Sequence, residues 1–368
     1  MSFNNSIPIY FYIPKQYFPE SGIPEQPNVY WHQFNLGITP GVYAWTIQTY
    51  QYLKADGLNC QLVGELPAEG IVFAHRKSLP TDFKPNDRTL IVCLKAESSA
   101  HPYAQIHVVG NEKDLDYQNM IFGDRYLYPN QKFYLPHWRQ PGLIPRNSSR
   151  QEKFENIAFF GESQNLASQL RGSQWRETLA NMGLQWHIVG KNRSHTWNDY
   201  SYIDCIVAVR QFDTEAKYTW KPALKLYNAW HAGVPAILGQ ESAYREARRN
   251  ELDYIEVATY EELLAALHKL KQHPHFRQQM IANGFERARE TSILRITALW
   301  QELIATEIIP AYCHWCKSAS YRHLFLHKRE LAWHSREQRK QLQQLRNTLG
   351  IRTRLRSTIE FYTQKKPF

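Results

Sequence analysis

The amino-acid sequence predicts an α/β protein with two Rossmann-like domains in tandem and a basic, helical C-terminal tail. Short β-branched apolar runs alternate with helical patterns in two successive series, which is typical of parallel sheets covered by helices. The length of 368 residues suits two domains. The formal net charge of +10 lies entirely in the residues from Lys317 onward, whereas residues 1–316 are balanced. We therefore expect a neutral globular body with a separate basic segment.

The first domain is predicted to span residues 1–140. Its strand candidates are short apolar runs bounded by turn residues. A helix from about Val42 to Ala55, closed by Gly57, lies between the first two of these strands. The predicted strands are Ile7–Ile13, Cys60–Val63, 70–75, 89–94 and 106–110. This alternation predicts a doubly wound sheet.

A second α/β series, predicted at 154–292, follows a linker at 141–153 in a proline-rich stretch without apolar periodicity. The predicted strands are 156–161, 186–190, 202–210 and 234–239, and the predicted helices are 174–182, 221–233, 261–270 and 276–290. Gly233 stands where the second of these helices must stop. The repetition of one pattern predicts a second Rossmann-like domain.

The remainder of the chain is predicted to be helical. An apolar-periodic helix at 293–318 precedes a basic amphipathic tail at 319–368, in which leucines recur at heptad-like spacing. Three interpretations of this tail stay open: attachment to an anionic membrane surface, a coiled coil, or docking on the body. A basic cluster gains roughly 1 kcal/mol per Lys or Arg near an anionic surface.

Several functional classes are disfavoured. Five scattered cysteines indicate a reducing compartment. We see neither a signal peptide nor a run of about 20 apolar residues, so we expect a cytoplasmic protein, soluble or peripheral to the membrane. P-loop, G-x-G-x-x-G and H-E-x-x-H motifs are absent. Asp114-Leu-Asp116 and the pair Cys313 and Cys316 lack supporting ligands, so we predict no metal site and no cofactor.

The stretch from Tyr218 to Arg249 carries most of the predicted binding residues. A helix, a tight turn and a buried strand ending at Gly239 are followed by a new helix. Ligands of open α/β sheets bind outside the carboxyl ends of the strands, where a helix N-terminus offers N–H groups to a phosphate. The candidates are Arg210, Lys221, Lys225, Asn228, Glu241, Ser242 and Tyr244. The cations suit a diphosphate, and the amide and carboxylate suit ribose hydroxyls. This combination predicts a site for a nucleoside diphosphate.

The segment KPALKLYNAWHAGVPAILG at 221–239, followed by Glu-Ser, resembles the donor-binding region of the GT-B glycosyltransferases. The resemblance covers about residues 155–290, and the N-terminal domain only by pattern. Lys225-Leu-Tyr-Asn228-Ala is similar to a segment of the α1,3-fucosyltransferases, whose lysine meets the donor diphosphate. Leu224 replaces the glutamate of that segment, and Trp220 and Asn228 stand at the two carboxylate positions of the large retaining family. The resemblance implies two Rossmann-like domains, a nucleotide-sugar held mainly by the second, and no essential metal.

The acceptor side offers fewer candidates. His32 precedes a glycine-containing loop, and Glu97 follows the strand at 89–94. In an inverting enzyme one of them would be the general base that deprotonates the acceptor hydroxyl, whereas a retaining enzyme needs no such base. His137 in the linker region is a weaker candidate.

We therefore expect a cytoplasmic, metal-independent glycosyltransferase that moves a sugar from a nucleotide-sugar donor to a glycan or lipid-linked acceptor. A nucleotide-sugar 2-epimerase of the same fold is one alternative, and it would need carboxylates and a histidine in the cleft. A nucleic-acid-binding protein that uses the basic tail is another. No RRM, KH or helix-turn-helix signature supports it, so we expect no nucleic-acid partner.

Overall fold

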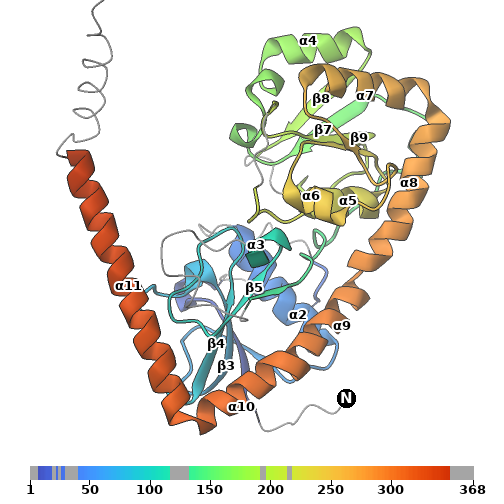
Figure 1. Ribbon diagram of the computed structural model, residues 1–368. Coiled ribbons are helices and arrows are strands. Elements are labelled where there is room, and N and C mark those ends of the chain that lie inside the picture. Colours follow the sequence, from blue (N-terminus) through green and yellow to red (C-terminus); the bar gives the residue numbers. More distant parts are fainter. Residues whose placement is uncertain are drawn as a thin grey trace, which may run out of the picture.

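The computed structural model describes residues 7–18, 22–23, 26–29, 40–116, 132–190, 196–213 and 218–348. Figure 1 shows two α/β domains, with a run of C-terminal helices that leads from the second back along the first. Each domain is built on one sheet of parallel strands. The predicted fold class is confirmed.

The sheet of the first domain has the strand order β2-β1-β3-β4-β5-β6. Its strands are β1 Ile9–Tyr12, β2 Gln61–Val63, β3 Gly70–His75, β4 Thr89–Leu94, β5 Ile106–Val109 and β6 Lys132–Tyr134. β3 and β4 are buried along their whole length, as expected for central parallel strands covered on both faces. The predicted runs at 70–75 and 89–94 are confirmed, whereas β6, with only three residues, was not predicted.

The helix predicted from about Val42 to Ala55 is present and begins slightly earlier. It consists of α1 Pro40–Val42, a π-helical turn Tyr43–Ile47 and α2 Gln48–Ala55. Its buried face belongs to the core of the first domain, where Trp45 and Tyr52 pack beside Phe11 and Phe73. A short helix, α3 Lys113–Asp116, follows β5.

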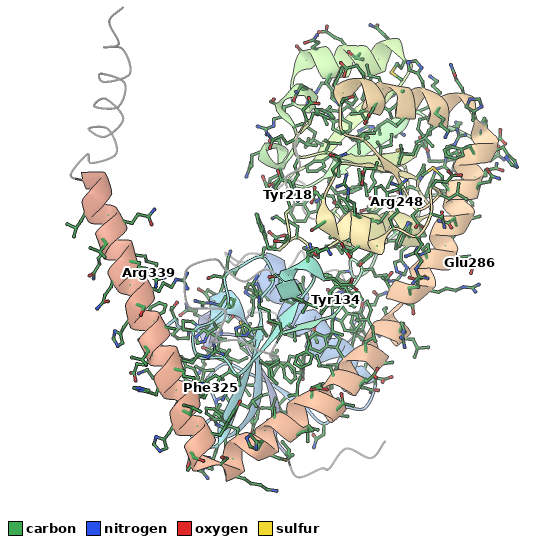
Figure 2. The ribbon with its side chains drawn as sticks, viewed as in Figure 1. Tyr134, Tyr218, Arg248, Glu286, Phe325 and Arg339 are labelled. Carbon is green, nitrogen blue, oxygen red and sulfur yellow. The ribbon has the colours of Figure 1, made fainter. Side chains whose placement is uncertain are left out.

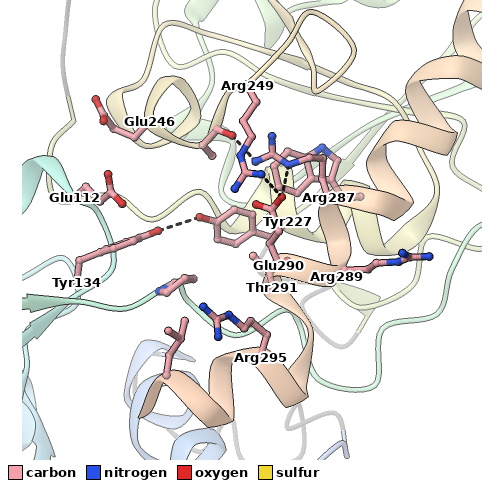
Figure 3. Close-up of a pocket in the computed structure, with 14 residues that line it drawn as sticks. Glu112, Tyr134, Tyr227, Glu246, Arg249, Arg287, Arg289, Glu290, Thr291 and Arg295 are labelled. Atoms are coloured by element: carbon pink, nitrogen blue, oxygen red, sulfur yellow. Dashed lines mark hydrogen bonds and ion pairs between the residues drawn. The ribbon is translucent and has the colours of Figure 1, made fainter. Parts of the chain in front are cut away.

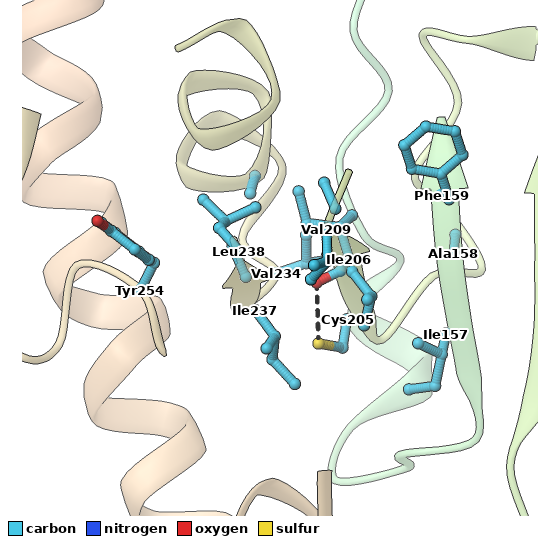
Figure 4. Packing of buried hydrophobic residues seen from close by; sticks show 14 of the residues in the cluster. Ile157, Ala158, Phe159, Cys205, Ile206, Val209, Val234, Ile237, Leu238 and Tyr254 are labelled. Atoms are coloured by element: carbon cyan, nitrogen blue, oxygen red, sulfur yellow. Dashed lines mark hydrogen bonds between the residues drawn. The ribbon is translucent and has the colours of Figure 1, made fainter. Parts of the chain in front are cut away.

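The sheet of the second domain has the order β11-β10-β9-β7-β8. Its strands are β7 Asn156–Phe160, β8 Gln185–Val189, β9 Cys205–Ala208, β10 Ala236–Leu238 and β11 Ile255–Glu256. Its helices are α4 Ser173–Asn181, α5 Leu224–Ala232, α6 Ser242–Ala247, α7 Tyr260–Gln272 and α8 Pro274–Ala288. Figure 4 shows the apolar side chains of β7, β9 and β10 that meet in the core between these layers.

The boundaries of α5 refine one prediction. The helix expected over 221–233 begins only at Leu224, so Lys221 and Pro222 lie in the turn before it. Gly233 ends the helix with a positive φ of 67°, as predicted. A side chain at this position would also meet the ring of Phe285, at 2.6 Å from its Cβ.

Both sheets have a topological switch point, where the direction of strand addition reverses. In the first sheet it lies between β1 and β3, and in the second between β7 and β9. Ligands of open α/β sheets bind in the crevice outside the carboxyl ends of the strands at this point. The strand orders therefore fix where a site should lie before any side chain is considered.

The C-terminal helices complete the core of the first domain. They are α9 Ile293–Leu303, a π-helical turn Ile304–Ile308, α10 Ile309–Lys317 and α11 Ala319–Thr348. Trp300, Trp315 and Phe325 pack in the same core cluster as β1, β3 and β4, and the chain thus returns from the second domain to the first (Figure 1). Within the described ranges, we find no helix long and apolar enough to cross a membrane.

Candidate functional site

Lys225 lies at the switch point of the second sheet. It stands in the first turn of α5, and its Nζ lies 5.4 Å from the ring centre of Phe159 in β7. Its Cε is 4.0 Å from the position that a Cβ would take at Gly161, the residue directly after β7. In the described part of the chain, no hydrogen bond or ion pair engages this ammonium group. The sequence prediction for Lys225 thus coincides with the position that the topology indicates.

The surroundings of Lys225 alter its protonation. Burial, followed by the positive charge of Arg210, lowers the pKa of Lys225 to about 8, and Glu241 and Glu97 act in the opposite direction. The lysine is therefore charged at neutral pH although its surroundings disfavour the charge. A bound anion would balance the positive charge of Lys225.

Arg210 and Glu241 form a pair at the same edge. Arg210 follows β9, and its Nε lies 3.0 Å from Oε1 of Glu241, directly before α6. Burial opposes the charge of Arg210, but Glu241 and Tyr244 outweigh it and raise the pKa of the guanidinium. Pairing of Arg210 with a carboxylate is thus present in the structure. Contacts of either side chain with a ligand stay predictions.

Lys221 connects the two domains. Its Nζ forms an ion pair with Oε2 of Glu97, which follows β4 of the first domain. Glu97 is 48% exposed, and the preceding residue, Ala96, has a positive φ of 48° that few non-glycine residues adopt. The pair joins a predicted donor-binding residue to a predicted general base. We call Glu97, Arg210, Lys221, Lys225 and Glu241 the charged cluster.

The sequence analysis missed Asn111, which fastens the domains together beside this cluster. Asn111 is 1% exposed, and its Nδ2 donates to the carbonyl oxygen of Lys221 and to Oγ of Ser242, both at 2.9 Å. The preceding Gly110 comes close to the second domain, because a Cβ there would lie 3.3 Å from Pro222. A polar residue directly after a buried strand was the available signal. Ser242 is engaged by this contact, and the helix that it opens, α6, has only six residues.

The other predicted side chains lie elsewhere. Oδ1 of Asn228 accepts a hydrogen bond of 2.9 Å from the backbone of Gln140, so this amide holds the segment that joins the domains. Tyr244 is 2% exposed and packs within the core of the second domain. His137 is buried with its ring edge-on to Trp45. Donor contacts of Asn228 and Tyr244 stay predictions. His32 lies outside the described residues.

A second missed residue, His75, ends β3 at the switch point of the first sheet. Its Nδ1 accepts a hydrogen bond of 3.0 Å from the backbone of Lys77, and burial lowers its pKa to about 3. The ring is therefore neutral, with its proton on Nε2. Nε2 lies 3.7 Å from where a Cβ at Gly41 would be, beside the start of α1.

The acidic pattern at Asp114 has a structural explanation. Oδ2 of Asp114 accepts a hydrogen bond of 2.6 Å from Lys95, and both side chains are almost completely buried. Burial raises the pKa of Asp114, and Lys95 offsets part of that rise. Over the ranges that the structure describes, no group of three or more His, Cys, Asp or Glu side chains could hold a metal ion. Independence from metal stays a prediction.

A separate cavity of about 590 Å³ lies between the domains, beside the end of α8 (Figure 3). Tyr134 and Tyr227 meet across it, with their hydroxyl oxygens 3.3 Å apart. Several of its charged side chains are already compensated: Glu290 contacts Arg249 at 2.8 Å and Arg287 at 3.2 Å, and Arg287 also contacts Asp253. Arg295, which also lines the cavity, has no carboxylate partner among the described residues, but it is exposed to solvent, whereas Lys225 is partly buried.

Comparison with known proteins adds little beyond the architecture. No protein-family model and no curated protein sequence matches this chain. Among solved structures, AviGT4, a glycosyltransferase involved in avilamycin A biosynthesis, is 10% identical over 84% of this chain and 98% of its own, with a TM-score of 0.48. Anabaena HepE in complex with UDP and glucose is 9% identical over 82% of this chain and 100% of its own, with a TM-score of 0.46. Sucrose-phosphate synthase from Thermosynechococcus elongatus is 11% identical over 74% of this chain and 81% of its own, also with a TM-score of 0.46.

These likenesses are too distant to carry an argument about function. The two parallel-sheet domains are established by their own strand orders, and they agree with the architecture that the GT-B resemblance implies. The narrower similarity to the α1,3-fucosyltransferases stays a prediction.

Proposed function

We propose that this protein transfers a sugar from a nucleotide-sugar donor to a hydroxyl group of a glycan or lipid-linked acceptor, without an essential metal ion. The observation that carries the proposal is Lys225. It is a charged ammonium group without a carboxylate partner among the described residues, and it lies at the switch point of the second sheet. A diphosphate bound there would supply the negative charge that balances the ammonium group of Lys225.

The cations of the charged cluster would act on the leaving group. When the bond between the sugar and the donor breaks, negative charge develops on the departing diphosphate. Fixed cations close to that charge lower the barrier without reorganising. Lys225 and Lys221 are the groups that we assign to this task, and they would do what a divalent metal ion does elsewhere. Arg210, paired with Glu241, would hold the geometry of the strand end.

Glu97 is our candidate general base. In a displacement with inversion, the acceptor oxygen attacks the anomeric carbon, the bond to the diphosphate oxygen breaks, and the hydroxyl proton moves to a carboxylate. Glu97 reaches the second domain from the end of β4 and pairs with Lys221. Donor phosphate would compete for Lys221, and the carboxylate would then be free to accept the proton.

Thermal-shift measurements with UDP, GDP, ADP and CMP derivatives test the proposal. We expect one nucleotide diphosphate to raise the unfolding temperature of the protein, and Lys225→Met to abolish the rise. Lys269→Met is the matched control, because Lys269 also lies over an aromatic ring, 3.8 Å from the centre of Phe276, but stands on α7 away from the switch point. Lack of response to every nucleotide, or equal responses of the two variants, would refute a donor site at Lys225.

A further inference from the structure

The first part of α11 is anchored to the first domain. Phe325 is 8% exposed in the core cluster that contains Trp315, and the neighbouring Arg329 is 2% exposed. Glu330 forms an ion pair of 2.5 Å with Lys84. These contacts fix the direction in which the helix leaves the domain.

The second part of α11 leaves the body. Every described side chain from Gln338 to Leu345 is exposed. Figure 2 shows Phe325 beside the first sheet and Arg339 farther along the helix. Of the three interpretations of the tail, docking on the body thus holds for the start of α11 and does not hold for residues 338–345.

Four leucines on α11 are directed to solvent. Leu324, Leu331, Leu342 and Leu345 are 53%, 55%, 58% and 56% exposed. A helix turns by about 100° per residue, so separations of 7, 11 and 3 residues place all four within about 60° of one another around the axis. We call these four residues the leucine stripe. Phe325 and Arg329 lie on another side of the helix, so docking does not cover the stripe.

Positive charge accompanies the leucine stripe. The sequence of α11 contains seven Lys or Arg and two Glu, and both glutamates pair with lysines, Glu330 with Lys84 and Glu337 with Lys340. Lys328 and Arg339 are exposed, and their positions lie about 40–60° to one side of the stripe. Apolar side chains flanked by cations are the pattern of a helix that lies in a lipid–water interface.

We propose that the leucine stripe of α11 binds the surface of an anionic lipid bilayer. The leucines would enter the headgroup region, while Lys328 and Arg339 contact lipid phosphates. A second copy of the chain fits this face less well, because Lys328, Ser335 and Gln338 occupy positions that a coiled coil would fill with apolar residues, and two such basic helices repel each other. The proposal is independent of glycosyl transfer and uses no residue of the charged cluster.

Vesicle sedimentation with the full chain tests this proposal. We expect the protein to bind vesicles that contain one third phosphatidylglycerol, to bind pure phosphatidylcholine much more weakly, and to dissociate at high salt. Leu331→Gln and Leu345→Gln should each weaken binding at least about fivefold, because each removes apolar area that the bilayer would bury. Leu294→Gln is the matched control: Leu294 is 77% exposed but stands on α9.

Each other outcome overturns the proposal. Equal binding to both kinds of vesicle would remove the role of the cations, and equal loss in the Leu294 control would remove the role of the stripe. A dimer in sedimentation velocity that both stripe variants dissociate, together with no vesicle binding, would assign the stripe to a second copy. Unfolding temperatures equal to that of the unsubstituted chain show that the variants are folded, and nucleotide binding should be unchanged in all of them.

Discussion

Two lysine–carboxylate pairs near the facing edges of the two sheets differ in every respect that matters for function. Lys95 and Asp114 belong to the same domain, are 3% and 1% exposed, and approach to 2.6 Å. Lys221 and Glu97 come from different domains and are 20% and 48% exposed. The first pair is sealed in the protein, whereas water and ligands reach the second. The first pair therefore suits stability, and the second can be opened by a competing anion.

Lys225 sharpens this contrast. Lys225 is partly buried, whereas Lys95 is almost completely buried, and Lys225 has a contact with the ring of Phe159 in place of a carboxylate partner. Removing one member of a buried lysine–carboxylate pair is strongly destabilising, whereas a desolvated lysine without a partner costs stability and gains from a bound anion. The presence or absence of a carboxylate partner thus distinguishes a structural lysine from a ligand-binding one.

The largest expected effect is on stability. Lys95→Met leaves the buried carboxylate of Asp114 with only the contact of Lys132, 4.0 Å away, and should lower the free energy of unfolding by up to about 3–5 kcal/mol. Lys225→Met removes a charge that burial disfavours and should leave stability unchanged or slightly higher. Urea unfolding of both variants measures the difference. Equal destabilisation would mean that Lys225 is as structural as Lys95.

The next largest effect concerns the pair of Lys221 and Glu97, which solvent reaches. Glu97→Gln should lower kcat on the order of 10²-fold through loss of the general base, with donor binding kept or strengthened because Lys221 is freed. Glu69→Gln is the control, since Glu69 is 54% exposed and pairs with Arg88 at 3.2 Å, but precedes β3 at the other end of the sheet. Full activity of the Glu97 variant would favour a retaining mechanism or another base.

How far the sequence could predict this contrast depends on the range of the contacts. The position of Lys225 follows from local pattern, because a helix that leads into a buried strand at a sheet edge can be recognised from neighbouring residues. The pair of Lys221 and Glu97 joins residues 124 positions apart. It depends on how one domain sits on the other, which Asn111 helps to set and which no local periodicity encodes. Asn228 was predicted as a partner of ribose hydroxyls from its amide group and its place in the segment 221–239, yet its side chain is held by the segment that joins the domains.

The pH dependence of donor binding should be a smaller effect than the loss of kcat in Glu97→Gln. With a pKa of about 8, Lys225 loses its proton above that pH, so nucleotide affinity should fall by at most about tenfold per pH unit there. The free energy of unfolding of the unliganded protein should instead rise with pH. The unfolded lysine keeps its proton up to its ordinary pKa of 10.5, so the unfolded state binds more protons over this window and stability rises with pH. Opposite slopes in thermal-shift series with and without nucleotide are expected, and Lys225→Met should remove both.

The smallest expected effect comes from Asn111, whose hydrogen bonds between the domains help to position the pair of Lys221 and Glu97. Asn111→Ala removes the donor to the carbonyl of Lys221 and to Ser242, each a net contribution of about 1 kcal/mol. Lys221 and Glu97 would then be positioned less firmly, so KM for the donor should rise a few fold, and the unfolding temperature should fall by a few degrees. Asn86→Ala is the control. Each asparagine accepts a hydrogen bond through Oδ1 from the backbone N–H two residues on and donates through Nδ2 to a carbonyl oxygen, but the exposed Asn86 does so only within the first domain. If both variants raise KM equally, the contact between the domains does not position Lys221 and Glu97. The difference between the two lysine–carboxylate pairs would then rest on their burial alone.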